Sequence, residues 1–230
     1  MFGILSGRMT TILHIETATK VCSVALSVNG ELKQLREFKD DGYAHGEQLT
    51  ILVQQVLDLE NISAGQLTAV SVSAGPGSYT GLRIGVSTAK GLCYALKIPL
   101  IAVNTLESMA EIGRMKYPES NLCPMIDARR MEVFSLITDP QGAILKPASA
   151  DVLDENTYHD FEPLVCFGDG APKMQELWAN RQLTVDAELD PSAKGQVAIA
   201  FQKFTKEEFE DVAYFEPDYL KEFYMPSKKA

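Results

Sequence analysis

SAGPGSYTGLRIGVSTAKGLCYAL, residues 73–96, is the stretch that decides the fold of this chain. The run 69–74 that leads into it is short, β-branched and closed by Gly-Pro-Gly, which predicts a buried strand. Apolar residues then recur at helical spacing and predict a helix over 80–96: Leu82, Val86, Ala89, Cys93 and Leu96. In a strand–turn–helix arrangement, backbone N–H groups at the helix start can bind an anion. Gly75, Gly77 and Ser78 are therefore candidate nucleotide-binding residues.

The glycine-rich turn differs from both common phosphate-binding motifs. A Walker A loop needs Gly-Lys-Ser/Thr, whereas Leu82 and Arg83 follow Gly81. The dinucleotide fingerprint needs a third glycine at the position of Thr80. The sequence therefore favours a tight turn that depends on glycine dihedral angles, with Ser78 as the N-cap of the helix.

The predicted helix 80–96 has little polar surface. Its polar stripe is narrow: Arg83, Ser87, Lys90 and Tyr94. A second strip beside the core face is small or apolar: Ile84, Thr88, Gly91 and Ala95. Because a surface helix usually carries one apolar stripe and a broad polar face, we expect this helix to be covered on more than one side.

The composition is that of an acidic globular chain. Its 230 residues are 46% hydrophobic and 23% charged, enough for a core in one large domain or two small lobes. The net charge of −10 argues against a domain that binds RNA or DNA alone. The cysteines are far apart in apolar runs, which favours buried free thiols in a reducing compartment: Cys22, Cys93, Cys123 and Cys166.

Two features of the chain bear on its location. No apolar run approaches about 18 residues, so we expect no membrane span and a cytoplasmic protein. Residues 1–8 are too short for a signal peptide. We expect them to be an N-terminal extension, or residues foreign to the natural protein, with Met9 as the natural first residue.

The first half of the chain is predicted as β-β-β-α-β-α, followed by a further strand and helix. Hydrophobic period and turn residues place these elements at 11–17, 21–28, 31–38, 47–59, 69–74, 80–96, 100–103 and 105–115. Asn29-Gly30 predicts a type I′ hairpin turn between the second and third strands. Thr105 is the expected N-cap of the last helix.

The second half begins the same plan again. Strands are predicted at 122–127, 132–138, 143–148, 164–168 and 183–187, and helices at 172–180 and 191–204. Segments 15–30 and 126–142 share an acid, a gap, a strand and a glycine turn, which is an architectural repeat. We therefore predict an α/β fold of duplicated β-β-β-α-β-α lobes, 9–104 and 105–230, in the actin-like ATPase (ribonuclease H-like) superfamily. The last piece, 215–224, is predicted to be irregular and folded back on a lobe.

Candidate catalytic groups are few. Glu16 and Asp127 each end the first strand of a lobe, where they could hold a cation with phosphate or act as a base. An actin-like kinase places an acid-Gly-x-Thr turn at this point, whereas Ala18 follows Thr17 here. Since positioning is most of phosphoryl-transfer chemistry, the missing glycine disfavours a kinase that acts alone.

The remaining polar motifs favour structural roles. No two of the histidines have the i, i+4 spacing of a metal pair: His14, His45 and His159. No serine lies in a nucleophile elbow. Gly168-Asp169-Gly170 could contact phosphate or ribose, although a strand-to-helix turn is favoured. Asp127-Ala-Arg129-Arg130 could bind an anion or pair with the acidic surface. We expect no catalytic residue and no metal site.

Eight short motifs follow one another in a fixed order. They are ILHIET (12–17), HGE (45–47), AGPGSYTGLRIG (74–85), AKGL (89–92), IPLI (98–101), DARR (127–130), GDGA (168–171) and PDYL (217–220). In this order they resemble the TsaB (YeaZ) family, bacterial accessory proteins of tRNA threonylcarbamoyladenosine synthesis. The resemblance runs from Met9 over nearly the whole chain. Glu16 stands where members often carry Asp, Gly46 where Ser is usual, and residues 144–161 match only loosely.

The resemblance implies an inactive paralogue of the transferase TsaD. In the family, TsaD holds a metal through an HxxxH pair and transfers threonylcarbamoyl to the adenosine beside the anticodon of tRNAs that read codons beginning with A. This chain would dock on TsaD, with the ATPase TsaE joining, and would pair with itself when TsaD is absent. It would have no cofactor of its own, with ATP or ADP at the level of the complex. It would reach tRNA only indirectly, through the complex.

The docking helices of the family correspond to residues 47–59 and 80–96. From wheel position, the expected contacts are outward residues of both helices: Ile51, Gln54, Gln55, Asp58, Arg83, Ser87, Lys90 and Tyr94. Two other functions stay open at this point. One is an actin-like ATPase or kinase that binds nucleotide as an isolated chain. The other is a glycoprotease-like hydrolase, which the missing HxxxH pair and the lack of a Ser/His arrangement disfavour.

Overall fold

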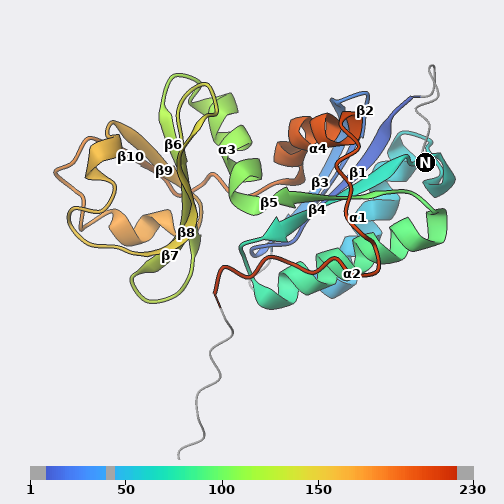
Figure 1. Cartoon of the computed structure of the whole chain (residues 1–230), viewed down its shortest axis with the longest axis horizontal. Coiled ribbons are helices and arrows are strands. Elements are labelled where there is room, and N and C mark those ends of the chain that lie inside the picture. Colours follow the sequence, from blue (N-terminus) through green and yellow to red (C-terminus); the bar gives the residue numbers. More distant parts are fainter. Residues whose placement is uncertain (1–8, 40–44, 222–230) are drawn as a thin grey trace, which may run out of the picture.

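Short β-branched runs separated by turn residues form two β-sheets, one in each half of the chain (Figure 1). The computed structural model describes residues 9–39 and 45–221, and within them each sheet has five strands. The expectations for residues 1–8 and for the end of the segment 215–224 lie outside the described residues.

The first sheet has the strand order β3-β2-β1-β4-β5. Its strands are β1 (Thr11–Glu16), β2 (Val21–Val28), β3 (Glu31–Lys39), β4 (Ala69–Gly75) and β5 (Leu100–Asn104). β1, β2 and β3 are antiparallel neighbours, whereas β4 runs parallel to both β1 and β5. Asn29 and Gly30 both have positive φ, 51° and 79°, which confirms the predicted type I′ turn between β2 and β3.

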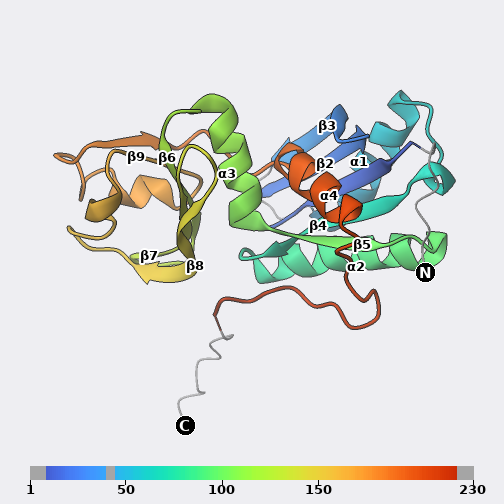
Figure 2. The ribbon, with the colours of Figure 1, turned by 45° about the horizontal axis from the view of Figure 1, so that its top comes forward.

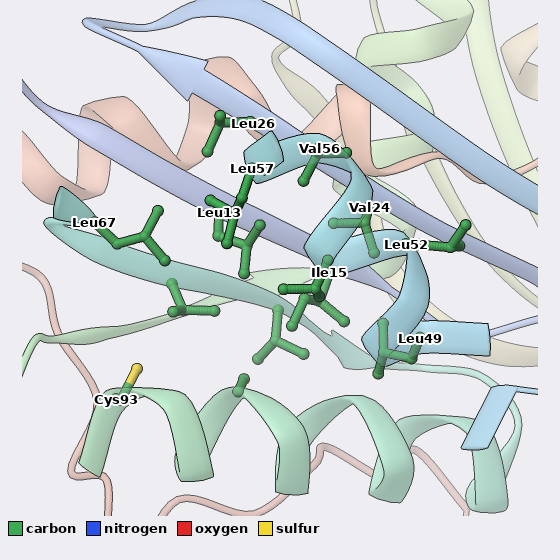
Figure 3. Close-up of a cluster of buried hydrophobic side chains, with 14 of the residues drawn as sticks. Leu13, Ile15, Val24, Leu26, Leu49, Leu52, Val56, Leu57, Leu67 and Cys93 are labelled. Atoms are coloured by element: carbon green, nitrogen blue, oxygen red, sulfur yellow. The ribbon is translucent and has the colours of Figure 1, made fainter. Parts of the chain in front are cut away.

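Two helices, α1 (His45–Leu59) and α2 (Tyr79–Leu96), cover one face of the first sheet. Successive strand residues point to opposite faces, so Leu13 and Ile15 of β1 both face these helices. Figure 3 shows the buried cluster between the sheet and the helices, with side chains from β1, β2, α1 and α2: Leu13, Ile15, Val24, Leu26, Leu49, Leu52, Val56, Leu57 and Cys93.

The opposite face of the first sheet is covered by α4 (Gln196–Thr205), which comes from the far end of the chain (Figure 1). Ala200 of α4 packs with a smaller apolar cluster of strand residues: Ile12, Ala69, Ile101 and Val103. The lobe boundary between residues 104 and 105 stays a prediction, but this helix from the second half of the chain lies on the first sheet.

The second sheet repeats the topology of the first. Its order is β10-β9-β6-β7-β8, with β6 (Asn121–Asp127), β7 (Glu132–Thr138), β8 (Ile144–Val152), β9 (Leu164–Phe167) and β10 (Leu183–Asp186). α3 (Thr105–Lys116) covers one face through Leu106 and Met109, which pack with Leu122 and Phe167. The predicted α/β fold with a duplicated plan is confirmed.

The prediction of a helix at residues 172–180 is wrong. Its place is taken by a short 3-10 turn, Ala171–Met174, followed by further turns. In this segment Gln175 and Ala179 donate backbone hydrogen bonds to residues three positions earlier, as in a 3-10 turn. Trp178 fixes this tight path because its indole N–H donates to the Asp154 carbonyl at 2.7 Å while its ring is buried.

Two helix starts also differ from their predictions. Asn104, not Thr105, is the N-cap of α3, because its side chain accepts from the N–H groups of Leu106 and Glu107. The helix predicted from residue 191 begins with a 3-10 turn, Ala193–Gly195, and α4 follows it.

All four cysteines are buried and free, as predicted. None of the helices in the described ranges is long and apolar enough to cross a membrane.

Candidate partner-docking surface

The exposed residues of α1 are mostly polar, with two large apolar exceptions, Ile51 and Leu59. The inner side of the helix fills the core through leucines and valines, and the outward side keeps Ile51, Gln54, Gln55 and Asp58 exposed. The side-chain amide of Gln54 donates to the Asp58 carboxylate at 2.7 Å, one turn away. Ile51 is 48% exposed, so it offers apolar contact area among polar neighbours.

α2 is fixed at both ends, which holds its outward residues in place. Ser78 is the N-cap, as predicted, and its Oγ accepts from the Gly81 N–H at 3.3 Å. At the other end, Lys97 takes the left-handed conformation and its N–H donates to the Cys93 carbonyl. Tyr94 is 83% exposed on the outward side of this rigid helix.

The segment 210–221, here called the C-terminal strap, runs along α2 (Figure 2). The Lys90 ammonium donates to the carbonyls of Ala213 (3.1 Å) and Phe215 (2.9 Å). The guanidinium of Arg83 donates to the Tyr219 hydroxyl at 3.3 Å. Arg83 and Lys90 are therefore engaged by the strap, whereas Ser87 and Tyr94 are exposed without such contacts to it. A docking role for these residues stays a prediction.

The strap also contacts the sheet edge and the second lobe. It begins where the Glu210 N–H donates to the Leu100 carbonyl of β5 at 2.9 Å. Farther along, the Asp218 N–H donates to the Ala74 carbonyl at 2.7 Å. It ends with an ion pair between Lys221 and Glu132 at the start of β7. The strap covers α2 on a second side, which confirms the expectation from its narrow polar stripe and the expectation that this segment folds back.

The glycine-rich turn packs against the turn between β1 and β2. The Ser78 N–H donates to the Ala18 carbonyl at 2.6 Å. A Cβ at Gly77 would overlap Ala18, and one at Gly81 would overlap the Thr17 carbonyl oxygen. Gly75 has φ +114° and lies against the strap. Each of these positions has a structural role, and nucleotide binding at Gly75, Gly77 and Ser78 stays a prediction.

A polar network is buried under α4. The ring nitrogens of His14 bond to the hydroxyls of Ser71 and Ser27, each at 2.7 Å. The Ser71 hydroxyl donates to Gln196 Oε1, and Gln196 Nε2 donates to the Ile15 carbonyl. Burial lowers the pKa of His14 to about 3, so this histidine is neutral and structural at neutral pH.

Glu16 and Asp127 lie in unlike environments, although each ends the first strand of its sheet. Glu16 is fully buried, and its Oε1 accepts from the Ala18 N–H at 2.7 Å and the Ser73 hydroxyl at 3.0 Å. Burial raises the pKa of Glu16 to about 7. Asp127 is exposed and pairs with Lys173 at 2.5 Å. Among the described residues, no three His, Cys, Asp or Glu side chains are grouped to hold a metal ion.

The polar motifs of the second lobe build turns. Gly168 has φ +96°, and the Gly168-Asp169-Gly170 turn leads from β9 into the 3-10 turn rather than into the predicted helix. Asp169 accepts from the Asp127 N–H at 2.9 Å, and burial raises its pKa. The Asp127 carboxylate in turn accepts from the Arg129 N–H at 2.5 Å, which fixes the hairpin tip.

Sequence reasoning missed two features of this surface. The elements that the strap contacts could not be predicted, because an irregular segment has no hydrophobic period from which a buried face can be inferred. The buried polar network did leave a signal, since polar residues lie two or four positions apart, on one face of each of three strands: His14 and Glu16, Ser23 and Ser27, Ser71 and Ser73. That alternation indicates one polar face that must be hydrogen-bonded internally.

This chain is similar to known proteins over most of its length. The family model described as TsaD, tRNA N6-adenosine threonylcarbamoyltransferase, matches residues 42–229. The tRNA threonylcarbamoyladenosine biosynthesis protein TsaB of Escherichia coli K12 is 32% identical in an alignment 222 positions long that covers 91% of this chain and 94% of that protein. The family-model match includes β4 and β5 of the first sheet, the whole second sheet and the strap.

Solved structures agree on the fold. YeaZ from Pseudomonas aeruginosa superposes with a TM-score of 0.78 at 27% identity, over 92% of this chain and all of that one. Component A of the (R)-2-hydroxyglutaryl-CoA dehydratase of Acidaminococcus fermentans shares the fold alone, with a TM-score of 0.51 at 8% identity over 86% of this chain and 99% of that one. The fold is of the actin-like ATPase class, and the chain belongs to the TsaB (YeaZ) family of tRNA threonylcarbamoyladenosine biosynthesis proteins.

Proposed function

We propose that this chain is a non-catalytic subunit of tRNA threonylcarbamoyladenosine synthesis that docks on TsaD through the outward faces of α1 and α2. The observation that carries the proposal is the exposure of Ile51 and Tyr94 on two helices whose inner sides already fill one core. Exposed apolar and aromatic side chains on rigid elements are typical anchors of protein interfaces.

The match to a TsaD family model supports TsaD as the partner. Because the match indicates that this chain and TsaD are related, we expect TsaD to have its own pair of equivalent helices. Two related helix pairs can pack face to face about a pseudo-twofold axis, and two copies of this chain can do the same. We place TsaD as the partner, TsaE as a further subunit, and the homodimer as the state without TsaD.

The absence of a catalytic role is supported by how the polar groups are used. The backbone donor of Ser78 is bonded to Ala18, and His14 and His45 are each hydrogen-bonded inside the first lobe. Glu16 lies at the position of a kinase acid, but no glycine follows in the turn. We propose that ATP or ADP acts only at the level of the complex, in the cytoplasm. Calorimetry of the isolated chain with ATP and magnesium should show no micromolar binding.

Co-purification with TsaD tests the docking surface. Ile51→Glu and Ser87→Glu each place a charge on an outward helix face, so each variant should lose the complex and the formation of threonylcarbamoyladenosine. Leu32→Glu is the matched control, because Leu32 is an apolar residue of similar exposure, 43%, that lies on β3 and belongs to neither helix. If both helix variants retain a stable complex, the docking surface lies elsewhere on the molecule.

A further inference from the structure

The hairpin tip between β6 and β7 carries two arginines that differ from the others. Across residues 9–39 and 45–221, the other four arginine side chains donate internally: Arg36 to the Leu35 carbonyl, Arg83 to Tyr219, Arg114 to Glu111 and Arg181 to Glu162. For the side chains of Arg129 and Arg130, the same ranges supply no hydrogen bond and no ion pair. Two guanidinium groups are thus displayed at one tip.

The nearest carboxylates do not neutralise them. Asp127 pairs with Lys173 at 2.5 Å, and Glu132 pairs with Lys221 of the strap. Lys173 also donates to the Glu132 carbonyl at 2.8 Å. Asp127 and Glu132 therefore each have their own lysine, and the two arginine charges remain beside one further carboxyl group, that of Asp169, whose pKa is raised by burial. This is unusual in a chain with a net charge of −10.

The backbone of the tip is held in a conformation that arginine does not favour. Arg129 and Arg130 have φ of 72° and 51°, in the left-handed region. Hydrogen bonds enforce it: the Glu132 N–H donates to the Arg129 carbonyl at 3.2 Å, and the Ala128 N–H donates to the Glu132 carbonyl at 3.1 Å. Glycine or asparagine would take this turn at lower cost, so the turn itself does not call for arginine. Such locally costly residues concentrate at functional sites.

We infer that Arg129 and Arg130 bind phosphate groups of the tRNA backbone when this chain is assembled with TsaD. The inference rests on the proposed function, because it needs the complex to bring tRNA to the tip, and it replaces the expected indirect contact with tRNA by a direct one. A guanidinium matches the oxygens of a phosphodiester with two parallel hydrogen bonds. The overall negative charge explains why the contact forms only in the complex, since two cations cannot hold RNA against the repulsion of the whole chain. Among the components of the proposed complex, tRNA is the polyanion, so its phosphates are the occupant that two unpaired guanidinium groups favour.

The test uses the full chain reconstituted with TsaD and TsaE, and an unmodified tRNA transcript whose anticodon reads a codon beginning with A. The variant Arg129→Asn/Arg130→Asn removes both charges, and asparagine suits the left-handed backbone, so folding is preserved. The KM for tRNA should rise about tenfold, and the dependence of log affinity on log salt should become shallower by about one per arginine. Lys97→Asn/Lys206→Asn is the control, because it removes two exposed charges, one of them also at a left-handed position.

The outcomes separate the two levels of the proposal. Weaker tRNA binding by the arginine variant, with TsaD association and the control unchanged, supports the RNA contact. Wild-type tRNA affinity in the arginine variant overturns it while leaving the proposed function intact. Loss of TsaD association in the arginine variant also overturns it, because the tip then contacts protein. If the unaltered chain fails to associate with TsaD, the proposed function itself is overturned.

Discussion

Glu16 is a buried carboxyl group that no cation faces among the described residues. Its neighbours are neutral donors, the Ala18 N–H and the Ser73 hydroxyl, and its Oε2 has no hydrogen-bond partner there. Burial without a counter-charge disfavours the carboxylate, which is why its pKa rises to about 7. The folded chain therefore binds a proton at Glu16 that the unfolded chain has released by neutral pH.

The sign of the resulting pH dependence follows from that shift. The folded pKa lies above the unfolded value of 4.5, so the stabilisation is complete below pH 4.5 and is lost as pH rises to about 7. Glu16→Gln cannot ionise. The free energy of unfolding of this variant, relative to the parent chain, should increase by roughly 2–3 kcal/mol between pH 5 and pH 8, as measured by urea denaturation. If the free energies of unfolding of the two proteins changed equally with pH, Glu16 would have the same pKa in the folded and unfolded chains, which would contradict this prediction.

His14 works in the opposite direction, and the comparison of variant with parent removes its effect. Its folded pKa of about 3 lies below the unfolded 6.5, so its contribution is present above pH 6.5 and is lost as pH falls toward 3. Between about pH 4.5 and pH 6.5 the two groups oppose each other. The parent profile alone is therefore flatter than either group would make it, whereas the difference caused by Glu16→Gln isolates one of them.

At the scale of elements, two glycines of α2 differ in how closely other atoms pack against them. Gly81 has no room, because a Cβ there would overlap the Thr17 carbonyl oxygen, whereas at Gly91 nothing lies within 4 Å. Gly81→Ala should lower the free energy of unfolding by about 1–3 kcal/mol through overpacking. Gly91→Ala is the matched control and should raise it by up to about 1 kcal/mol through helix propensity. Midpoints of chemical denaturation check both, and a shift of the same sign in the two variants would contradict this packing.

Elements with a strong local signal were predictable from the sequence. The β2–β3 turn follows from Asn29-Gly30, and the start of α2 follows from Ser78, because each depends on residues adjacent in the chain. The segment after Ala171 was not predictable, since Met174 and Trp178 repeat at helical spacing but the path is set by a distant carbonyl, that of Asp154. Burial against a partner from another part of the chain overrides local period.

The candidate docking surface was predictable only in part, for the same reason. The outward position of Ile51 and Tyr94 follows from helical geometry. The engagement of Lys90 by the strap joins residues more than 120 positions apart, and no pattern in the sequence relates them. The expected partner and reaction came from the family resemblance. The structure adds that the polar stripe of α2 has one side in contact with the strap and one side that is exposed.

At the scale of the whole molecule, the strap connects the first sheet, α2 and the second lobe. Lys90→Met removes the donor to the Ala213 and Phe215 carbonyls while keeping a side chain of similar length. Hydrogen bonds from a charged donor contribute about 1.5 kcal/mol, so strap amides should exchange with solvent roughly tenfold faster. Hydrogen–deuterium exchange of the Asp218 region measures this. Lys206→Met, at an exposed lysine beyond α4, is the control, and equal exchange in both variants would mean that Lys90 does not hold the strap.

The placement of α4 has a consequence for synthesis. The helix lies on the first sheet, but it is made only after the entire second sheet. While the ribosome is still translating the latter half, Ile12, Ala69, Ile101 and Val103 have no permanent cover. The nascent chain must shield this apolar patch, through a chaperone or a temporary collapse, until residue 205 has left the exit tunnel. A chain that terminates before that point should be an aggregation-prone fragment rather than an independently folded lobe.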